Sequence, residues 1–386
     1  MLFPENKKVF FICAVALAFV CGTVAWMHKR PSLNDMVGQI IMTGFHGDGM
    51  GENADDFAAI ESQIQDGVIG GIILFDVDIS GLLARGMTME QAKQQIFSSN
   101  IKNIDQVKNM VSRLQKIAPK KLLVAVDQEG GNIQRLKPEH GFASIPSAAQ
   151  LGRGDTNTTY EIAYDLGSRL HDLGINMDFA PLLDVNVNPE SPAIGAKERS
   201  FSDDPETVAT FGGAFARGLA DAGIAYSFKH FPGHGSAGTD SHNGITDITN
   251  TYQEYELEPW RELLSDNDVR TTVMVAHVIN NNFDNVPASL SGKTISMLRD
   301  MGFDGVIVSD DMDMGAIANE YGLAQAIKMA LDAGNDVLVF GNNLTFDRNR
   351  GRDVHGIIMH LVDTGQIKKS RIRESYNRIM RLKKHI

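Results

Sequence analysis

The stretch LLVAVDQEGG at residues 122–131 places a carboxylate, Asp127, directly after five apolar residues. A continuous apolar run of this length is typical of a parallel strand that is buried on both faces, because a strand with one solvent face would alternate apolar and polar residues. Similar runs recur along the chain, at residues 40–43, 71–75, 177–180, 225–228, 272–275, 306–308 and 337–340. Together they predict eight buried parallel strands.

The segments between these runs carry helix signals. Asp204-Pro205-Glu206 combines an N-cap residue, a proline suited to the first helical position and an early acid. Gly223 and Gly334 each follow an alanine at a place where a helix is expected to stop. Strands that alternate with helices predict the α/β class and a single (β/α)8 barrel of the TIM type over residues 33–386. An open doubly wound sheet is the alternative, but no G-x-G-x-x-G motif follows the first strand.

Length and composition agree with a globular domain. The chain has 386 residues, of which 43% are hydrophobic and 22% are charged, and this composition excludes a disordered or fibrous protein. The net charge of -12 lacks the basic footprint of a nucleic-acid binder, so no nucleic-acid partner is expected. Both cysteines, Cys13 and Cys21, lie near the N-terminus, so the rest of the chain has no disulfide or thiol nucleophile.

Residues 1–32 are expected to form a targeting or anchoring segment. Lys7 and Lys8 precede an apolar run at residues 9–26, close to the roughly 20 residues that a membrane-spanning helix needs. Three interpretations remain open: an uncleaved hydrophobic anchor helix, a signal peptide cleaved near residues 23–25, or lipidation at Cys21. Each of them predicts export, with the domain anchored in the inner membrane and facing the periplasm or exterior, or secreted.

Several polar residues fall at or just after the end of an apolar run: Asp127, Asp184, Lys229, His230, His277 and Asp310. In a barrel, these positions form the C-terminal rim, where catalytic residues lie. A cap or loop role could explain any one of them alone, and His277 could belong to the rim or to the core. Their shared position favours an active site at this rim.

Two further segments stand out. Residues 76–100 form a connection longer than strand–helix loops usually are, and we expect an insertion that projects from the rim, either as a lid or partner surface or as a passive addition. Residues 367–386 are rich in Lys and Arg and carry apolar residues at helical spacing, which predicts a last barrel helix with a solvated basic face.

The densest polar cluster spans residues 229–242. Its proline and glycines exclude a regular helix, so a loop after a strand is predicted. Residues two apart in an extended loop point the same way, so Asp240 could hold His242 in one tautomer and let it donate and accept protons. Asp310, at the end of a buried strand, could attack a carbon electrophile. A nucleophilic carboxylate and a proton carrier suit double-displacement glycoside hydrolysis.

The same cluster permits a metal site. His230, His234, Asp240 and His242 offer nitrogen and oxygen ligands that could bind zinc. The cluster lacks a helical histidine pair such as H-E-x-x-H, so a metal-dependent hydrolase is only an alternative.

With these residues assembled, the sequence resembles the bacterial β-N-acetylglucosaminidases of glycoside hydrolase family 3 over roughly residues 33–345. The run KHFPGHG followed by DSH is the most specific part of the resemblance. The matching segments are GGIILF at 70–75, VDQEGG at 126–131 with the QR pair at 134–135, FAPLLDV at 179–185, RSF at 199–201, KHFPGHG at 229–235, DSH at 240–242, PASLS at 287–291 and SD at 309–310.

The resemblance implies a retaining mechanism with Asp310 as the nucleophile, His242 as the acid/base and Asp240 as its partner. It also implies that a set of polar residues holds the non-reducing N-acetylglucosamine, namely Asp127, Arg135, Arg199, Lys229 and His230. Such side chains suit the task, since Arg and Lys donate to hydroxyl and acetamide oxygens and Asp accepts from a hydroxyl. No cofactor and no metal are implied.

The expected function is therefore the removal of terminal β-linked N-acetylglucosamine from peptidoglycan fragments or related saccharides. Phosphorolysis is an alternative, because a histidine repels an incoming phosphate less than a carboxylate would. A wall-binding protein that keeps the pocket without turnover is the non-enzymatic alternative.

Overall fold

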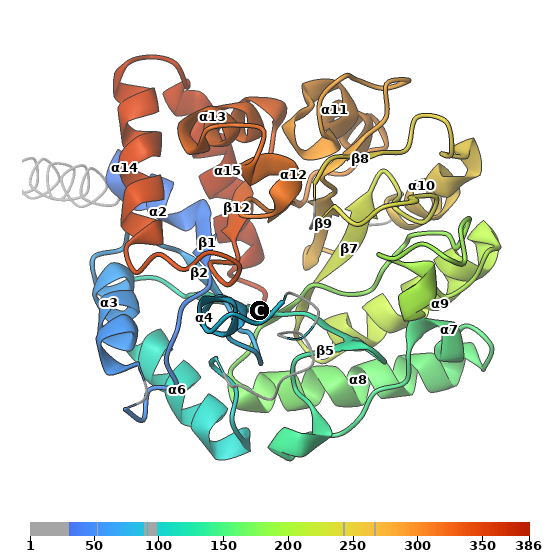
Figure 1. Cartoon of the computed structure of the whole chain (residues 1–386), viewed down its shortest axis with the longest axis horizontal. Helices are drawn as coiled ribbons and strands as arrows, with labels where there is room; N and C mark the ends of the chain where they lie inside the picture. Colours follow the sequence, from blue (N-terminus) through green and yellow to red (C-terminus); the bar gives the residue numbers. More distant parts are fainter. Residues whose placement is uncertain (1–30, 52, 89–90, 92–98, 242–243, 266–267) are drawn as a thin grey trace, which may run out of the picture.

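The computed structural model describes residues 31–51, 53–88, 91, 99–241, 244–265 and 268–386. Its centre is a closed barrel of parallel strands in the order β1-β12-β11-β9-β7-β6-β3-β2 (Figure 1). The strands are β1 (Ile41–Thr43), β2 (Gly71–Ile73), β3 (Leu123–Val126), β6 (Met177–Asp178), β7 (Ala225–Phe231), β9 (Thr271–Val275), β11 (Val306–Asp311) and β12 (Val337–Phe340). The predicted (β/α)8 barrel is confirmed, and all eight predicted strands are present.

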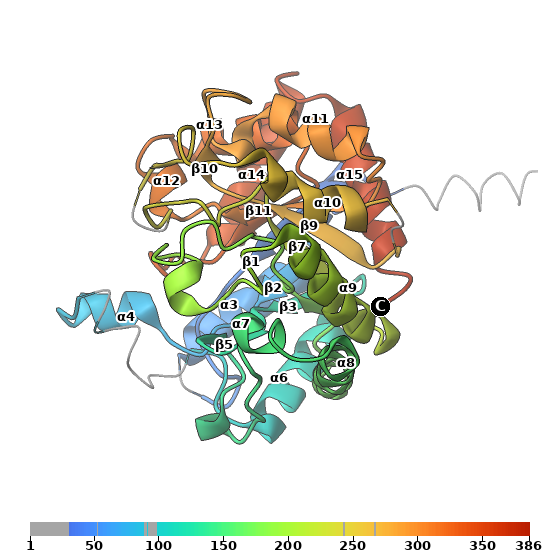
Figure 2. The same cartoon turned by 90° about the vertical axis from the view of Figure 1, so that its right-hand side faces the viewer.

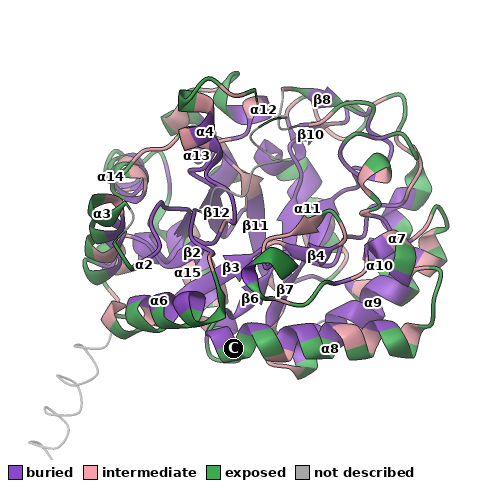
Figure 3. Cartoon of the chain, turned by 60° about the horizontal axis from the view of Figure 1, so that its bottom comes forward, coloured by how far each residue is buried: buried purple, intermediate pink, exposed green. Residues whose placement is uncertain are grey.

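Burial explains the apolar runs. Every residue of β3, β7, β9 and β12 is buried, and the barrel strands are coloured accordingly in Figure 3. In such a barrel, side chains on one face of each strand fill the interior and those on the other face pack against helices. The surrounding helices keep their exposed residues on the outer side. The core is therefore continuous from the barrel interior to the helical layer.

Most helices form an outer ring around the barrel, whereas α4 (Ile79–Ala84) lies over the barrel in the same view (Figure 1). The other helices of the chain that the structure describes are α2 (Leu33–Gln39), α3 (Ala54–Gln65), α6 (Ile104–Ile117), α7 (Ala148–Leu151), α8 (Thr156–Leu173), α9 (Pro205–Asp221), α10 (Glu258–Leu263), α11 (Gly292–Asp300), α12 (Gly315–Ala318), α13 (Leu323–Ala333), α14 (Arg350–Asp363) and α15 (Lys369–Leu382). Short strands outside the barrel pair as β4 (Gln128–Gly130) with β5 (Ile133–Gln134), and β8 (Thr246–Asp247) with β10 (Val278–Ile279).

The predicted helix boundaries around α9 and α13 are confirmed. The Asp204 carboxylate accepts a hydrogen bond from the Thr207 amide at 2.9 Å, and Pro205 is the first residue of α9. Gly223 and Gly334 follow the two helix ends with φ angles of 85° and 122°, which glycine adopts more readily than other residues.

The predicted loop over residues 229–242 begins too early. Strand β7 continues through Phe231, and the Lys229 carbonyl accepts a hydrogen bond from the Leu183 amide at 2.7 Å. On the other side, the Phe231 carbonyl accepts from the Ala276 amide at 2.9 Å. Since neighbouring segments satisfy its backbone groups, the strand extends into the polar residues, and Lys229 and His230 are held by the barrel itself.

The two ends of the barrel differ. Helix α4, which follows β2, projects from one end of the molecule, and the C-terminus lies at the other end (Figure 2). Residues 1–30, which carry the predicted anchor or signal, lie outside the described residues, as does most of the stretch 89–98 in the predicted insertion. In the part of the chain that the structure describes, no helix is both long and apolar enough to cross a bilayer.

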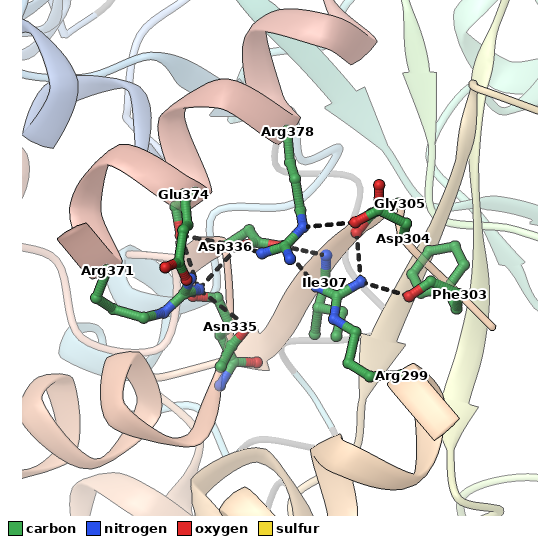
Figure 4. A network of polar contacts seen from close by, with 12 residues as sticks. Arg299, Phe303, Asp304, Gly305, Ile307, Asn335, Asp336, Arg371, Glu374 and Arg378 are labelled. Carbon is green, nitrogen blue, oxygen red and sulfur yellow. Dashed lines mark hydrogen bonds and ion pairs between the residues drawn. The ribbon is translucent and has the colours of Figure 1, made fainter. Parts of the chain in front are cut away.

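A buried aspartate joins the last helix to the end of the barrel opposite α4. Asp336, directly before β12, is fully buried, and its carboxylate accepts hydrogen bonds from Arg299, Arg371 and Arg378 at 2.8–3.3 Å (Figure 4). Two further donors reach the same carboxylate, the Ser375 hydroxyl and the Ile307 amide. Helix α15 is thereby fixed as the last barrel helix, as the spacing of its apolar residues predicted.

Candidate active site

A cavity of about 570 Å³ lies at the C-terminal ends of the barrel strands. The structure brings the predicted site residues that it describes into the lining of this one cavity: Asp127, Arg135, Arg199, Lys229, His230, Asp240 and Asp310. They come from segments far apart in sequence, and the barrel closure places them at one rim. The predicted acid/base, His242, lies outside the described residues.

Lys229 joins two carboxylates in the cavity lining. Its Nζ atom lies 2.9 Å from Asp127 Oδ1 and 2.6 Å from Glu129 Oε1, and the residue is only 2% exposed. Burial disfavours the ammonium, but the two carboxylates outweigh it and raise the pKa of Lys229. The Lys229 ammonium is therefore a cation held in a fixed position in the cavity wall.

Glu129 links Lys229 to Arg199. The Arg199 guanidinium pairs with both Glu129 oxygens, each at 2.7 Å, and also donates to the Ala193 carbonyl at 2.8 Å. Burial opposes ionisation of Glu129, yet Arg199 and Lys229 lower its pKa to about 2. Sequence reasoning assigned no role to Glu129; its place in the VDQEGG segment, two residues after Asp127, was the available signal.

Asp127 and Arg135 form the neighbouring part of the wall. Arg135 Nη2 lies 3.4 Å from Asp127 Oδ2, and its Nη1 lies 3.6 Å from Asp76 Oδ1. Burial opposes ionisation of Asp127, but Lys229 and Arg135 lower the pKa of its carboxyl group. Asp127 is therefore an ionised acceptor in the cavity.

His230 is oriented by Asp184. The imidazole Nδ1 lies 2.7 Å from Asp184 Oδ2, and the other carboxylate oxygen accepts from the amides of His230 and His234 at 3.2 and 2.8 Å. With Nδ1 directed at the carboxylate, Nε2 is the nitrogen left for the cavity side, where Arg199 Nη2 lies 3.5 Å away. Asp184 was predicted to lie at the rim, and the structure identifies it as the residue that positions His230.

The two adjacent aspartates at the end of β11 differ in environment. Burial and the nearby Asp313 raise the pKa of Asp311 to about 8, and its Oδ1 accepts from the Gly341 amide at 2.7 Å. Burial therefore disfavours a second full negative charge beside Asp310. The Asp311 amide donates to Asp310 Oδ1 at 2.8 Å, which orients that carboxylate.

His277, which the sequence left between rim and core, is a core residue. It is fully buried, and its Nδ1 lies 2.6 Å from the Ser289 hydroxyl. Its Nε2 lies 3.0 Å from the Asp311 carbonyl oxygen, so the ring supports the end of β11.

The segment that leads to His242 borders the cavity. Asp240 lies 3.2 Å from Lys197 Nζ, and the Ser241 hydroxyl lies 3.2 Å from His234 Nε2. The contact expected between Asp240 and His242 stays a prediction, because His242 is not among the described residues. Within the described ranges, no group of three or more His, Cys, Asp or Glu side chains is placed to hold a metal ion.

Comparison with known proteins agrees with this geometry. The model of the glycosyl hydrolase family 3 N terminal domain matches residues 32–382. The β-hexosaminidase LpqI of Mycobacterium tuberculosis is 39% identical over 233 residues, which cover 58% of this chain and 59% of that protein. A β-hexosaminidase of Shewanella frigidimarina is 34% identical over 287 residues, which cover 69% of this chain and 81% of that protein.

Solved structures give the same result. A glycoside hydrolase family 3 β-N-acetylglucosaminidase from Paenibacillus sp. str. FPU-7 superposes with a TM-score of 0.79 at 34% identity, over 92% of this chain and 63% of that one. The match thus spans less than two thirds of the Paenibacillus enzyme and of LpqI. Since the family model covers nearly all of the barrel, and the resemblance seen in the sequence is confirmed, the chain belongs to glycosyl hydrolase family 3.

Proposed function

We propose that this chain is a retaining exo-β-N-acetylglucosaminidase. The observation that carries the proposal is one rim cavity lined by Asp310 together with the five polar residues expected to hold the sugar: Asp127, Arg135, Arg199, Lys229 and His230. The similarity to β-hexosaminidases supports the same activity.

The polar wall suits a single terminal sugar. Asp127 is an ionised acceptor, while Lys229 and Arg199 present donors whose directions are fixed by Glu129. Each hydroxyl group of a pyranose can both donate and accept a hydrogen bond, so it can use donors and acceptors of this kind. These groups are paired and buried before the substrate arrives. Little side-chain conformational entropy is therefore lost when the sugar binds.

In the proposed mechanism, an Asp310 oxygen attacks the anomeric carbon as the glycosidic carbon–oxygen bond breaks, and His242 donates a proton to the departing oxygen. Water then attacks the same carbon, His242 accepts its proton, and the Asp310 carboxylate is released with net retention. The raised pKa of Asp311 favours this chemistry, because a second negative charge beside the nucleophile is disfavoured.

A panel of nitrophenyl β-glycosides tests the proposal. We expect turnover of the N-acetylglucosaminide with retention of configuration, and loss of turnover in Asp310→Ala with the fold intact. Preference for a glucoside or xyloside would overturn the substrate assignment. A sugar phosphate formed only when phosphate is added would replace hydrolysis by phosphorolysis.

We also propose that the enzyme acts outside the cytoplasm, on peptidoglycan fragments or related saccharides. The support is the apolar run at residues 9–26 behind Lys7 and Lys8, which suits an anchor or a signal. Fractionation of the expressing cells, with mass determination of the mature N-terminus, tests the location. Full-length protein in the cytosolic fraction would contradict it.

A further inference from the structure

The catalytic cavity has an apolar side that the proposed sugar-binding residues leave unused. Val77 and Ile79 from the segment after β2, and Leu344 from the segment after β12, line it. Val77 and Ile79 belong to a small hydrophobic cluster with Leu82 of α4, against which Leu344 packs. This group of Val77, Ile79 and Leu344, named here the apolar wall, is separate from the main core.

The barrel order sets the apolar wall across from Lys229 and His230. Strands β2 and β12 flank β1, whereas Lys229 and His230 come from β7, on the other side of the closed barrel. Asp310 belongs to β11, next to β12. A sugar attacked by Asp310 and held by the β7 side would therefore have the apolar wall within the same cavity.

The apolar wall also stands further out than the floor of the cavity. Buried side chains of the barrel region, such as Ile73, Phe179 and Val339, line the inner end. Val77 is four residues past the end of β2, and Leu344 is four residues past the end of β12. Helix α4 projects at this end of the molecule (Figure 2). Since the packed barrel closes the inner end, a leaving group extends outward, to the level at which these residues lie.

Hydrogen bonds fix the apolar wall in place. The Ile79 amide donates to the Asn343 side-chain oxygen at 3.1 Å, and the Ser80 amide donates to the Asn343 carbonyl at 2.9 Å. Asp78 caps α4 by accepting from the Gly81 amide at 2.7 Å. These bonds join the segment after β2 to the segment after β12, so the surface is built before a ligand binds.

The stacked rings of His46 and Phe346 support the N-terminal end of α4 through Asp78. His46 lies 3.3 Å from Asp78, and its ring stacks on Phe346 with centroids 3.9 Å apart. Asp78 and His46 are each 5% exposed. The N-terminal end of α4 is therefore buried, although the helix itself projects from the rim.

We propose that the apolar wall is the leaving-group subsite and selects aglycones that carry an alkyl or aryl group. This inference rests on the proposed N-acetylglucosaminidase activity and assigns its leaving-group specificity to the insertion after β2. An apolar group on the aglycone would be removed from water against Val77, Ile79 and Leu344, while a fully hydroxylated leaving group would gain nothing there.

A series of methyl, butyl and hexyl β-N-acetylglucosaminides tests the inference on the full-length protein. The alkyl leaving groups differ in apolar area but little in acidity, so chemistry is held constant. In the wild type, we expect kcat/KM to rise by roughly tenfold from the methyl to the hexyl glycoside. In Ile79→Ser and Leu344→Ser, the hexyl-to-methyl ratio should fall toward one.

Leu83→Ser is the matched control. Leu83 is in α4 and packs on the same cluster but does not line the cavity, so its variant should keep the wild-type ratio. A ratio near one in the wild type, with the methyl glycoside still hydrolysed, would overturn the subsite and leave the proposed activity standing. Equal flattening by Leu83→Ser would also overturn it. Failure to hydrolyse any member of the series would instead remove the proposed activity.

Discussion

The ammonium group of Lys229 lies 2.6 Å from the Glu129 carboxylate, although the two residues belong to different sheets. The Glu129 carboxylate also accepts hydrogen bonds from Nε and Nη2 of Arg199, each at 2.7 Å. One buried carboxylate thus holds two of the cations expected to bind the sugar, and it acts as a positioning residue.

Glu129→Gln should raise KM for an N-acetylglucosaminide by about tenfold, equivalent to about 1.4 kcal/mol, with a smaller effect on kcat. The amide removes the charge that fixes both cations but leaves Asp310 in place. Steady-state kinetics of the folded variant measure this split. Glu190→Gln, at an exposed position, is the matched control, and an unchanged KM in Glu129→Gln would show that Glu129 does not position the cations.

His242→Ala should be sensitive to the leaving group. General acid catalysis contributes about 10²–10⁴-fold when the departing oxygen needs a proton. We therefore expect a loss of that size for an alkyl N-acetylglucosaminide and a much smaller loss for a dinitrophenyl one. Comparison of kcat/KM for the two substrates gives the answer, and equal losses would remove His242 as the acid.

Asp336→Asn should destabilise the fold without changing KM. Three arginines donate to this fully buried carboxylate, and removal of one partner of a buried ion pair costs about 3–5 kcal/mol. Urea unfolding measures the loss. The control is Asp332→Asn, at an exposed position, which should cost no more than about 0.5 kcal/mol. Equal stability of the two variants would contradict the structural role given to Asp336.

Lys383 should make stability depend on pH. Burial, followed by repulsion from Lys120, lowers the pKa of Lys383 from 10.5 to about 7, while its Nζ donates to uncharged oxygens of Gln39 and Gly70. Between these pH values the unfolded chain binds more protons than the folded chain, so stability rises with pH there.

The free energy of unfolding of the wild type, relative to Lys383→Met, should therefore increase by at most about 1.4 kcal/mol per pH unit between pH 7 and about 10. Below pH 7 the difference should level off, since both states then hold the proton. Urea titrations of both proteins at several pH values test the sign. A difference that falls as pH rises would contradict the buried, readily deprotonated lysine.

The strands could be predicted because a strand that is buried on both faces has an unbroken run of apolar residues. The end of β7 could not, since Lys229 and His230 are polar and resemble loop residues until the barrel pairs their backbone with both neighbours. The candidate site followed the same pattern. The candidate residues at strand ends could be predicted, because the C-terminal ends of all barrel strands meet at one rim.

Contacts between side chains that lie far apart in the sequence could not be predicted. Glu129 meets Arg199 and Lys229 across separations of 70 and 100 residues, and nothing local marks that contact. The distinction between Asp310 and Asp311 in the structure likewise depends on burial near Asp313, which one sequence does not state.

In the proposed mechanism, Asp310 forms a covalent bond to the sugar. The most direct test of this step is mass spectrometry of the protein treated with a fluorinated, slowly released N-acetylglucosamine analogue, followed by peptide mapping. We predict one added glycosyl group on the peptide that contains Asp310, and no addition in Asp310→Asn. A label on another residue, or an equal label in Asp310→Asn, would contradict the account.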